Sequence, residues 1–112
     1  MSSHIVILVT TKDGTEAEKI LRQLLGARLV ACGNIVSGVK SLFWWEGKID
    51  EAAEALLVLK SRSDLFGKIT QCVRAHHSYS VPEILALPVA DGHGDYLKWI
   101  DESAQGASPL NE

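Results

Sequence analysis

Two short runs of consecutive apolar residues most constrain what this chain can fold into. They cover residues 5–9 (IVILV) and 55–59 (ALLVL), and both are made of aliphatic side chains. Successive side chains of a strand point to opposite faces of a sheet, so strands of this composition bury both faces. We therefore expect a central strand over residues 4–11 and a second strand over 48–60 whose end is equally apolar.

The segment after the first strand has helical periodicity. Apolar residues at 17, 20, 21, 24 and 25 share one face, whereas polar or charged residues at 16, 18, 19, 22 and 23 fill the other. Thr15 followed by Glu18 has the spacing of a capping box, and Gly26 suits a C-terminal stop. The pattern predicts a helix over residues 15–26.

The middle of the chain has the pattern of a long β-hairpin followed by a second helix. Residues 29–45 are extended in character, Gly33 and Gly38 are expected bulge or twist sites, and residues 46–47 suit the turn. Residues 61–64 then offer helix caps, and residues 65, 69, 72, 73 and 76 fall on one helical face. We expect this helix to end near His76 and His77.

The last part of the chain predicts one more strand and a short helix. Residues 83–90 form a buried strand in which Pro88 favours an edge position, and residues 95–104 have helical spacing. The order βαββαβ plus a C-terminal helix is that of a ferredoxin-like α+β sandwich, here a single domain over residues 1–104. Residues 105–112 have no pattern and are expected to form a mobile tail.

In this fold both main helices cover one face of the sheet and leave the other face bare. Monomers rarely expose an apolar patch of that size, so we expect the subunits to associate. Trp44 and Trp45 are neighbours in one strand and point to opposite faces. One indole is therefore expected in the helix-covered core and the other against a partner.

Composition excludes several classes of function. Fourteen acidic and eleven basic residues give a net charge of -3, and the basic residues are scattered, so no nucleic-acid surface is expected. No apolar run approaches the roughly 20 residues of a membrane span, and none at the N-terminus suits a signal peptide. The two cysteines, Cys32 and Cys72, form no C-x-x-C motif. These features predict a cytoplasmic protein with reduced thiols.

Catalytic motifs are missing from the sequence. It contains no nucleophile elbow, no zinc-protease or deaminase signature and no phosphate-binding loop. We therefore expect the protein not to be an enzyme.

The tandem histidines His76 and His77 are the first candidate site. Imidazole is a common ligand of copper and zinc, but neighbours on a helix diverge by about 100°, so both reach one ion only where the helix has ended. Alternatively, a histidine in the last turn bonds the final carbonyls and complements the helix dipole. Cys32 and Cys72 are more typical of small buried side chains than of ligands.

The second candidate site is polar. Glu54 interrupts an apolar strand, Lys60 stands at that strand's end, and Glu83 follows Pro82. With Tyr79 these residues could form a polar pocket, and they could equally be charges at the rim of the molecule.

Five strings resemble motifs of the CutA family of divalent-cation tolerance proteins, in the same order and register. They extend over almost everything from residue 5 to about residue 103 and read LVACGNI (29–35), SLFWWEGKI (41–49), EALLVLK (54–60), HxYxxPEIxALP (77–88) and DYLxW (95–99). The resemblance implies a homotrimer of ferredoxin-like subunits, related in architecture to the PII signalling proteins. It also implies a role in copper and other divalent-cation tolerance and in the response to metal ions.

The resemblance further implies site residues. Copper binding carries over to His76 and His77, although Val9 stands where some members have a cysteine, which removes the softest ligand. Ser78 and Ser80 also depart from the usual family residues. The resemblance also implies an inter-subunit pocket, formed by Cys32, Trp45, Glu54, Lys60, Tyr79 and Glu83.

Two functions therefore stay open. In one, the trimer binds copper or another divalent cation at the histidines and buffers or senses the ion. In the other, a PII-like signalling or scaffold trimer binds an organic ligand or a protein partner in the inter-subunit pocket.

Overall fold

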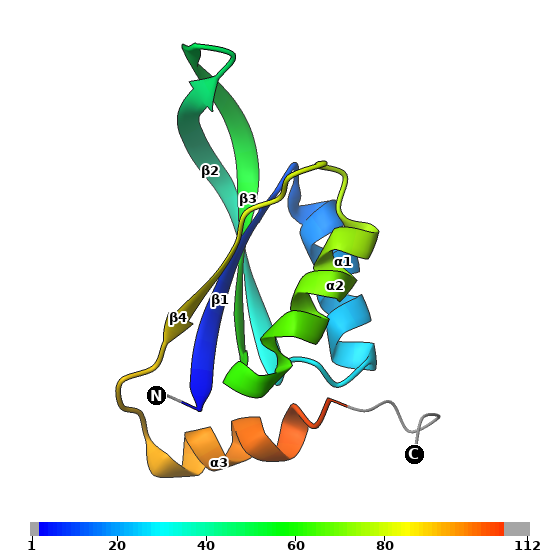
Figure 1. Ribbon diagram of the computed structural model, residues 1–112, viewed down its shortest axis with the longest axis vertical. Coiled ribbons are helices and arrows are strands. Elements are labelled where there is room, and N and C mark those ends of the chain that lie inside the picture. The colour runs from blue at the N-terminus through cyan, green and yellow to red at the C-terminus, as the bar shows by residue number, and fades with distance from the viewer. Residues whose placement is uncertain (1–2, 107–112) are drawn as a thin grey trace.

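The computed structural model describes residues 3–106 and has two layers, a four-stranded antiparallel sheet and two helices on one of its faces (Figure 1). The strand order in the sheet is β2-β3-β1-β4. The elements are β1 (His4–Thr11), α1 (Gly14–Gly26), β2 (Cys32–Trp45), β3 (Lys48–Arg62), the 3-10 turn η1 (Ser63–Leu65), α2 (Phe66–His76), β4 (Ile84–Pro88) and α3 (Gly94–Ser103). This is the ferredoxin-like sandwich that the order of elements predicts.

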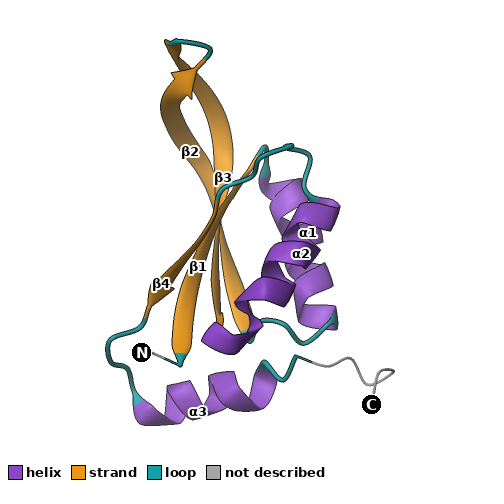
Figure 2. Ribbon diagram, viewed as in Figure 1, coloured by secondary structure: helices purple, strands orange, loops and turns teal. Residues whose placement is uncertain are grey.

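Strand β1 is central in the sheet, as its composition predicts, but within one subunit only one of its two faces is buried. It pairs antiparallel with β3 on one side and with β4 on the other. Its odd-numbered residues Ile5, Ile7 and Val9 are buried under α1 and α2, together with Leu57 and Leu59 of β3. The core therefore lies between the sheet and the helix pair (Figure 2).

Helix α1 begins earlier than predicted, and its capping differs. Asp13 is the N-cap, and its carboxylate accepts a hydrogen bond from the Glu16 backbone N–H at 2.8 Å. The predicted capping box of Thr15 and Glu18 is therefore wrong, and Glu18 instead pairs with Arg22. Glu16, expected on the polar face, is only 7% exposed because its carboxylate binds backbone amides on two sides.

Two glycines of β2 have different roles. Gly38 has a φ of +74° and lies at the register shift between Val36 and Val39, which confirms the predicted bulge there. Gly33 lies in regular pairing, where a Cβ atom would come within 2.6 Å of Leu21 and 2.9 Å of Leu59. Its role is close packing of α1 onto the sheet rather than a bulge.

The second half of the fold departs from prediction in two places. Helix α2 is preceded by η1 and has no side-chain cap, so the expected caps at residues 61–64 are wrong. Strand β4 lies at the sheet edge as Pro88 predicts, but it is not buried: Leu85 is 56% exposed and Leu87 is 48% exposed. The helices lie on the opposite face from these two side chains.

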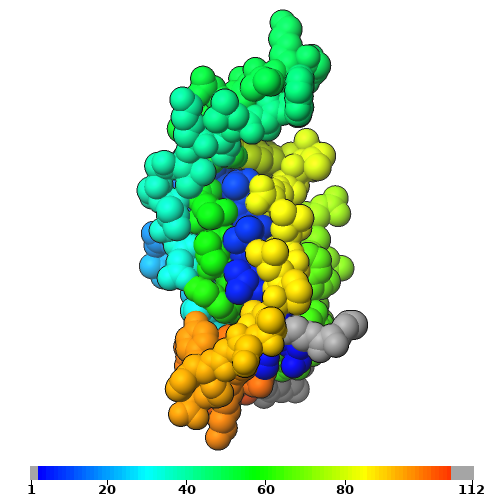
Figure 3. All heavy atoms as spheres, turned by 90° about the vertical axis from the view of Figure 1, so that its left-hand side faces the viewer, coloured from blue at the N-terminus to red at the C-terminus, as the bar shows by residue number. Residues whose placement is uncertain are grey.

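The face of the sheet turned away from α1 and α2 is uncovered along all four strands (Figure 3). It exposes Val36, Leu85 and Leu87 in the described chain. Beyond Val39 the β2–β3 hairpin projects past the helices, so that Trp44 and Trp45 are 74% and 61% exposed (Figure 1). The expectation that one indole joins the core is wrong, since no helix reaches that part of the hairpin.

Helix α3 lies across the end of the sheet opposite the hairpin tip (Figure 1). The imidazole of His4 pairs with Asp101 at 3.0 Å, and the Arg28 and Arg62 guanidinium groups donate to the carbonyls of Ser103 and Ala104. Of the predicted mobile tail, only residues 105–106 are described, and there Gly106 N–H donates to the Arg28 carbonyl. Residues 107–112 lie outside the described residues.

Candidate functional site

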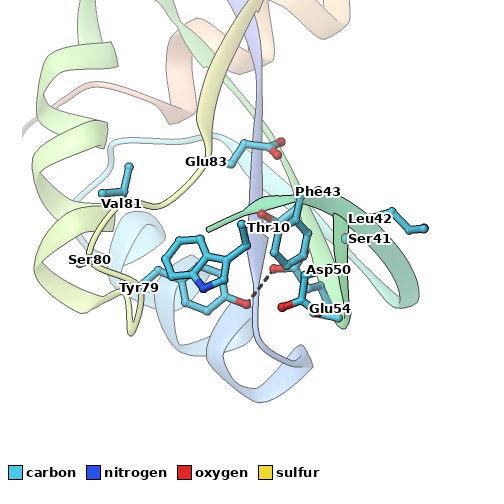
Figure 4. Close-up of a pocket in the computed structure, with 12 residues that line it drawn as sticks. Thr10, Ser41, Leu42, Phe43, Asp50, Glu54, Tyr79, Ser80, Val81 and Glu83 are labelled. Carbon is cyan, nitrogen blue, oxygen red and sulfur yellow. Dashed lines mark hydrogen bonds between the residues drawn. The ribbon is translucent and has the colours of Figure 1, made fainter. Parts of the chain in front are cut away.

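Four predicted pocket residues, Trp45, Glu54, Tyr79 and Glu83, line one cavity of about 780 Å³ at the base of the hairpin (Figure 4). The cavity lies between the hairpin and the loop that follows α2. Strands β2 and β3 supply one wall and residues 79–83 supply another. The remaining lining residues, not predicted from sequence, are Thr10, Ser41, Leu42, Phe43, Asp50, Ala52, Ser80 and Val81.

The pairing of β2 with β3 explains which residues meet in the cavity. Asp50, Ala52 and Glu54 alternate along β3 and so share one face, and Phe43 lies directly opposite Asp50. These positions continue the uncovered sheet face into the hairpin. A period of two along β3 was therefore the signal in the sequence that would have added Asp50 to the site, whereas Phe43 follows from the register of β2 with β3.

Tyr79 and Glu54 join the two walls of the cavity. The Tyr79 hydroxyl donates a hydrogen bond of 2.7 Å to Glu54 Oε2 (Figure 4). Burial and this bond, together with the negative charges of Glu54, Glu16 and Asp13, raise the pKa of Tyr79 to about 12. The phenol therefore stays neutral and acts as a hydrogen-bond donor to a charged carboxylate.

Cys32 and Lys60 lie together at another place on the sheet. They are directly opposite each other in the β2–β3 pairing, near α3. Lys60 is on the same face as Glu54 but six residues along β3, which corresponds to roughly 20 Å. Its ammonium group donates to Asn34 Oδ1, and Cys32 Sγ contacts the Tyr96 hydroxyl at 3.4 Å. Within one subunit the six predicted residues thus form two clusters.

The two adjacent histidines have different environments. His76 Nδ1 donates to the Cys72 carbonyl at 2.9 Å, as expected for a histidine in the last turn of a helix. His77 is beyond the helix: its Nε2 donates to the Thr10 carbonyl at 2.8 Å, and its Nδ1 accepts from the Tyr79 backbone N–H at 3.0 Å. Both nitrogens of His77 are used, and only Nε2 of His76 is left without a hydrogen bond in the described structure.

Glu16 holds the loop that carries Tyr79. Its carboxylate accepts from the Ser78 N–H at 2.7 Å and from the Lys12 N–H at 3.0 Å. Burial alone raises the pKa of Glu16, but the bonds from Ser78 and Lys12 and the nearby His77 outweigh that effect and leave the pKa below its usual value. The sequence did not identify Glu16 as a functional residue, because it lies on the polar face of the predicted helix and polar faces are usually exposed to solvent.

Metal-binding side chains do not cluster within one subunit. Over residues 3–106 there is no group of three or more histidine, cysteine, aspartate or glutamate side chains that could hold an ion. Both cysteines are free, and burial raises the pKa of the Cys72 thiol, which disfavours the thiolate form that binds metals. A complete coordination shell would need ligands from a second copy or from water.

Together, the ferredoxin-like sandwich, the projecting hairpin and the cavity at its base define a small α+β protein with one cavity large enough for a small molecule. The sequence profile described as CutA1 divalent ion tolerance protein matches residues 5–103. The chain belongs to this family.

Relatives and solved structures agree with that assignment. The divalent-cation tolerance protein CutA of Archaeoglobus fulgidus is 43% identical over 91% of this chain and 99% of its own length. Protein CutA 1, chloroplastic, of Oryza sativa subsp. japonica is 40% identical over 90% of this chain, which spans 57% of that protein. The structure of the divalent cation tolerance protein from Thermus thermophilus superposes with a TM-score of 0.89 at 40% identity, covering 90% of this chain and 98% of that one.

Where the names of these relatives state a role, it is divalent-cation tolerance, and the names differ in the location that they give. The rice protein is called chloroplastic, and the Archaeoglobus protein whose structure is solved is called periplasmic. None of the described helices is long and apolar enough to cross a membrane.

Proposed function

We propose that the protein acts in copper tolerance and in the response to metal ions, as a homotrimer that binds copper and catalyses no reaction. The observation that carries this proposal is the unbonded Nε2 of His76 at the end of α2. Its Nδ1 is fixed by the Cys72 carbonyl, which orients the ring and leaves the other nitrogen as a ligand. Family membership supports the general role in divalent-cation tolerance.

A single imidazole nitrogen does not bind copper tightly. His77 contributes a structural role, because its ring connects Thr10 of β1 to Tyr79 of the loop. Val9 offers no sulfur, so the remaining ligands come from other copies of the chain or from solvent. This chain therefore holds copper weakly and exchanges it readily, which suits buffering or sensing better than storage.

Titration calorimetry of the assembled protein with copper tests this proposal. His76→Gln should weaken copper binding at least tenfold, on the order of 1.4 kcal/mol, because it removes the open nitrogen. Binding should also weaken between about pH 7 and about pH 5, since protons compete for the same nitrogen. The exposed histidine of the α3 N-cap provides the control, and His93→Gln should leave the affinity unchanged. Equal affinities for the two variants would refute the assignment to His76.

We place the protein in the cytoplasm. Two free cysteines support this location, because cytosolic thiols stay reduced whereas exported proteins tend to form disulfides. Subcellular fractionation with an antibody against the chain tests it, and recovery in an exported fraction would contradict it.

A second function is supported by a separate observation, the cavity at the base of the hairpin. The cavity of about 780 Å³ falls in the range typical of small-molecule sites and is lined by aromatic and polar side chains. We propose that the trimer binds an organic ligand there, in the manner of a PII-like signalling or scaffold protein. A thermal-shift screen of neutral, anionic and cationic compounds tests this function, since a ligand of the native state raises its stability.

A further inference from the structure

We propose that the cavity at the base of the β2–β3 hairpin binds an organic ammonium cation between its aromatic and acidic side chains. This inference rests on the second function proposed above and names the chemical class of the ligand. It follows from the composition of the cavity wall, the spacing of its carboxylates and the hydrogen bond of Tyr79.

All charged side chains that line the cavity are negative. Asp50, Glu54 and Glu83 line it, and its lining residues include no lysine, arginine or histidine. None of these three carboxylates forms an ion pair with another described residue. The neighbouring Glu51, by contrast, is paired with Lys40 at 3.2 Å on the strand. Within one subunit the cavity thus carries negative charge without a cationic side chain beside it, and such a site attracts a cation.

The spacing of the carboxylates favours an organic cation over a metal ion. Asp50 and Glu54 are four residues apart on one face of β3, so their backbones are about 13 Å apart along the strand. No group of three acidic, histidine or cysteine side chains in the described chain could hold a single ion. A ligand that places an ammonium group beside one of these carboxylates and its body against the aromatic rings is therefore favoured over a single metal ion held by all of them.

Aromatic rings supply the other half of the site. Phe43, Trp45 and Tyr79 line the cavity, and the face of an aromatic ring attracts an ammonium group held within about 6 Å. The Tyr79 hydroxyl is engaged by Glu54, and the Tyr79 ring also contacts the His77 ring at a centroid distance of 4.8 Å. These contacts orient the phenol before a ligand arrives, which reduces the entropic cost of binding.

A matched pair of probes tests the inference on the assembled, full-length protein. Choline carries a quaternary ammonium group, and 3,3-dimethylbutan-1-ol has the same shape with a neutral carbon in its place. We expect choline to bind at least tenfold more tightly than the alcohol, measured by calorimetry and by the change in tryptophan fluorescence. Equal affinities, or no saturable binding of choline at millimolar concentration, would overturn the proposal.

Variants locate the binding to the cavity. Glu54→Gln keeps the shape and an acceptor for Tyr79 but removes the charge, and should weaken choline binding at least tenfold. The control Glu51→Gln changes a carboxylate outside the cavity wall and should alter the affinity less than twofold. Tyr79→Phe keeps the ring but removes the hydrogen bond to Glu54 that orients it, so choline should still bind, with a lower affinity than to the wild-type protein. If Glu54→Gln and Glu51→Gln behave alike, the cavity is not the site.

The outcomes separate this inference from the function on which it rests. If a neutral or anionic compound binds with an affinity that depends on residues of the cavity while choline does not, the organic-ligand function stands and the ammonium assignment fails. If no compound of any charge binds, because a side chain of another copy fills the cavity, both fail. Copper binding through His76 is measured separately, and Glu54→Gln should not affect it.

Discussion

Glu16 shows how one buried carboxylate determines the position of a functional loop. Its two oxygens accept backbone N–H groups from Lys12, at the end of β1, and from Ser78, after α2. A carboxylate is the side chain best suited to this position, because both of its oxygens are acceptors. The loop that carries Tyr79 is thereby fixed to the start of α1.

We predict that Glu16→Gln destabilises the fold by about 1 to 3 kcal/mol, because the amide NH₂ faces one of the two backbone donors and leaves it unpaired. Urea denaturation near pH 7 measures this loss of stability as a lower urea concentration at the midpoint of unfolding. The matched control is Glu18→Gln on the exposed surface of α1, where Glu18 forms an i,i+4 pair with Arg22. That change should cost no more than about 0.5 kcal/mol. Equal costs would contradict the role assigned to Glu16.

The pKa of Glu16 also predicts how stability depends on pH. The pKa is lower in the folded protein than the usual 4.5, so folding favours the ionised form. The stabilisation is fully present above the unfolded value and is lost as the pH falls through the folded value, which lies below 4.5. Stability of the wild-type protein should therefore fall more steeply below about pH 4.5 than that of Glu16→Gln.

At the scale of elements, helix α3 is attached to the rest of the fold by arginine contacts as well as by burial. Only Ile100 of this helix is buried, with Ala104 just after it. The Arg62 guanidinium binds Asp64 through two nitrogens, at 3.1 and 2.6 Å, and donates its third nitrogen to the Ala104 carbonyl. Lysine cannot reproduce this three-way contact because its ammonium is a point charge.

We predict that Arg62→Lys loosens α3 without unfolding the sheet. Amide hydrogens of residues 97–103 should exchange with solvent about tenfold faster, which corresponds to about 1.4 kcal/mol of local opening, while those of β1 and β3 keep their protection. Arg22→Lys on α1 is the control, because Arg22 is exposed and pairs with a single carboxylate. Uniformly faster exchange over the whole chain would show that Arg62 stabilises the entire domain instead.

The elements themselves were largely predictable from the sequence. Apolar periodicity identified the strands, the helices and the central position of β1, because burial on one or both faces leaves a direct pattern of period two or 3.6. The N-cap of α1 is a local contact of Asp13 with the Glu16 N–H, which the spacing of Thr15 and Glu18 obscured, whereas contacts between distant segments leave no pattern in the sequence. Glu16 is the clearest case: its partner Ser78 is 62 residues away in sequence.

The candidate site was only partly predictable for a similar reason. Glu54, Tyr79, Trp45 and Glu83 meet around one cavity, which the family motifs indicated but spacing alone did not. Lys60 lies six residues beyond Glu54 in the strand predicted over residues 48–60, so its separation of roughly 20 Å from Glu54 already followed from the sequence. The tandem histidines likewise differ in role only because the helix ends between them, which gives His77 an extended backbone.

At the scale of the whole molecule, the uncovered sheet face and the projecting hairpin dominate. The accessible surface is 7106 Å², whereas a compact monomer of 12.2 kDa would expose about 6,100 Å². The exposed apolar side chains include Val36, Leu85 and Leu87 on the sheet and Leu42, Phe43, Trp44, Trp45 and Ile49 on the hairpin. Such a surface is typical of a subunit that is incomplete without its partners.

Association would bury enough of this surface to stabilise the subunit itself. A standard interface buries roughly 800 Å² per partner, and at about 25 cal/mol per Å² its apolar part yields on the order of 20 kcal/mol before the costs of association. That gain is comparable to or larger than the net stability of a small domain, about 5 to 15 kcal/mol. The isolated subunit is therefore expected to be marginally stable, and assembly and folding to be coupled.

We predict that the protein sediments as a trimer of 36.6 kDa, three times 12.2 kDa, over a hundredfold range of concentration. Leu85→Lys places a charge on the uncovered face and should shift the population to smaller species. Leu25→Lys, on the helix-covered side at 41% exposure, is the control and should leave the trimer intact.

Sedimentation equilibrium decides among the outcomes: a folded monomer at low concentration would overturn the coupling of folding to assembly, and a dimer would overturn the threefold symmetry. Because the charge in Leu85→Lys lies outside the subunit core, circular dichroism of the dissociated variant also measures directly how much structure one subunit keeps alone.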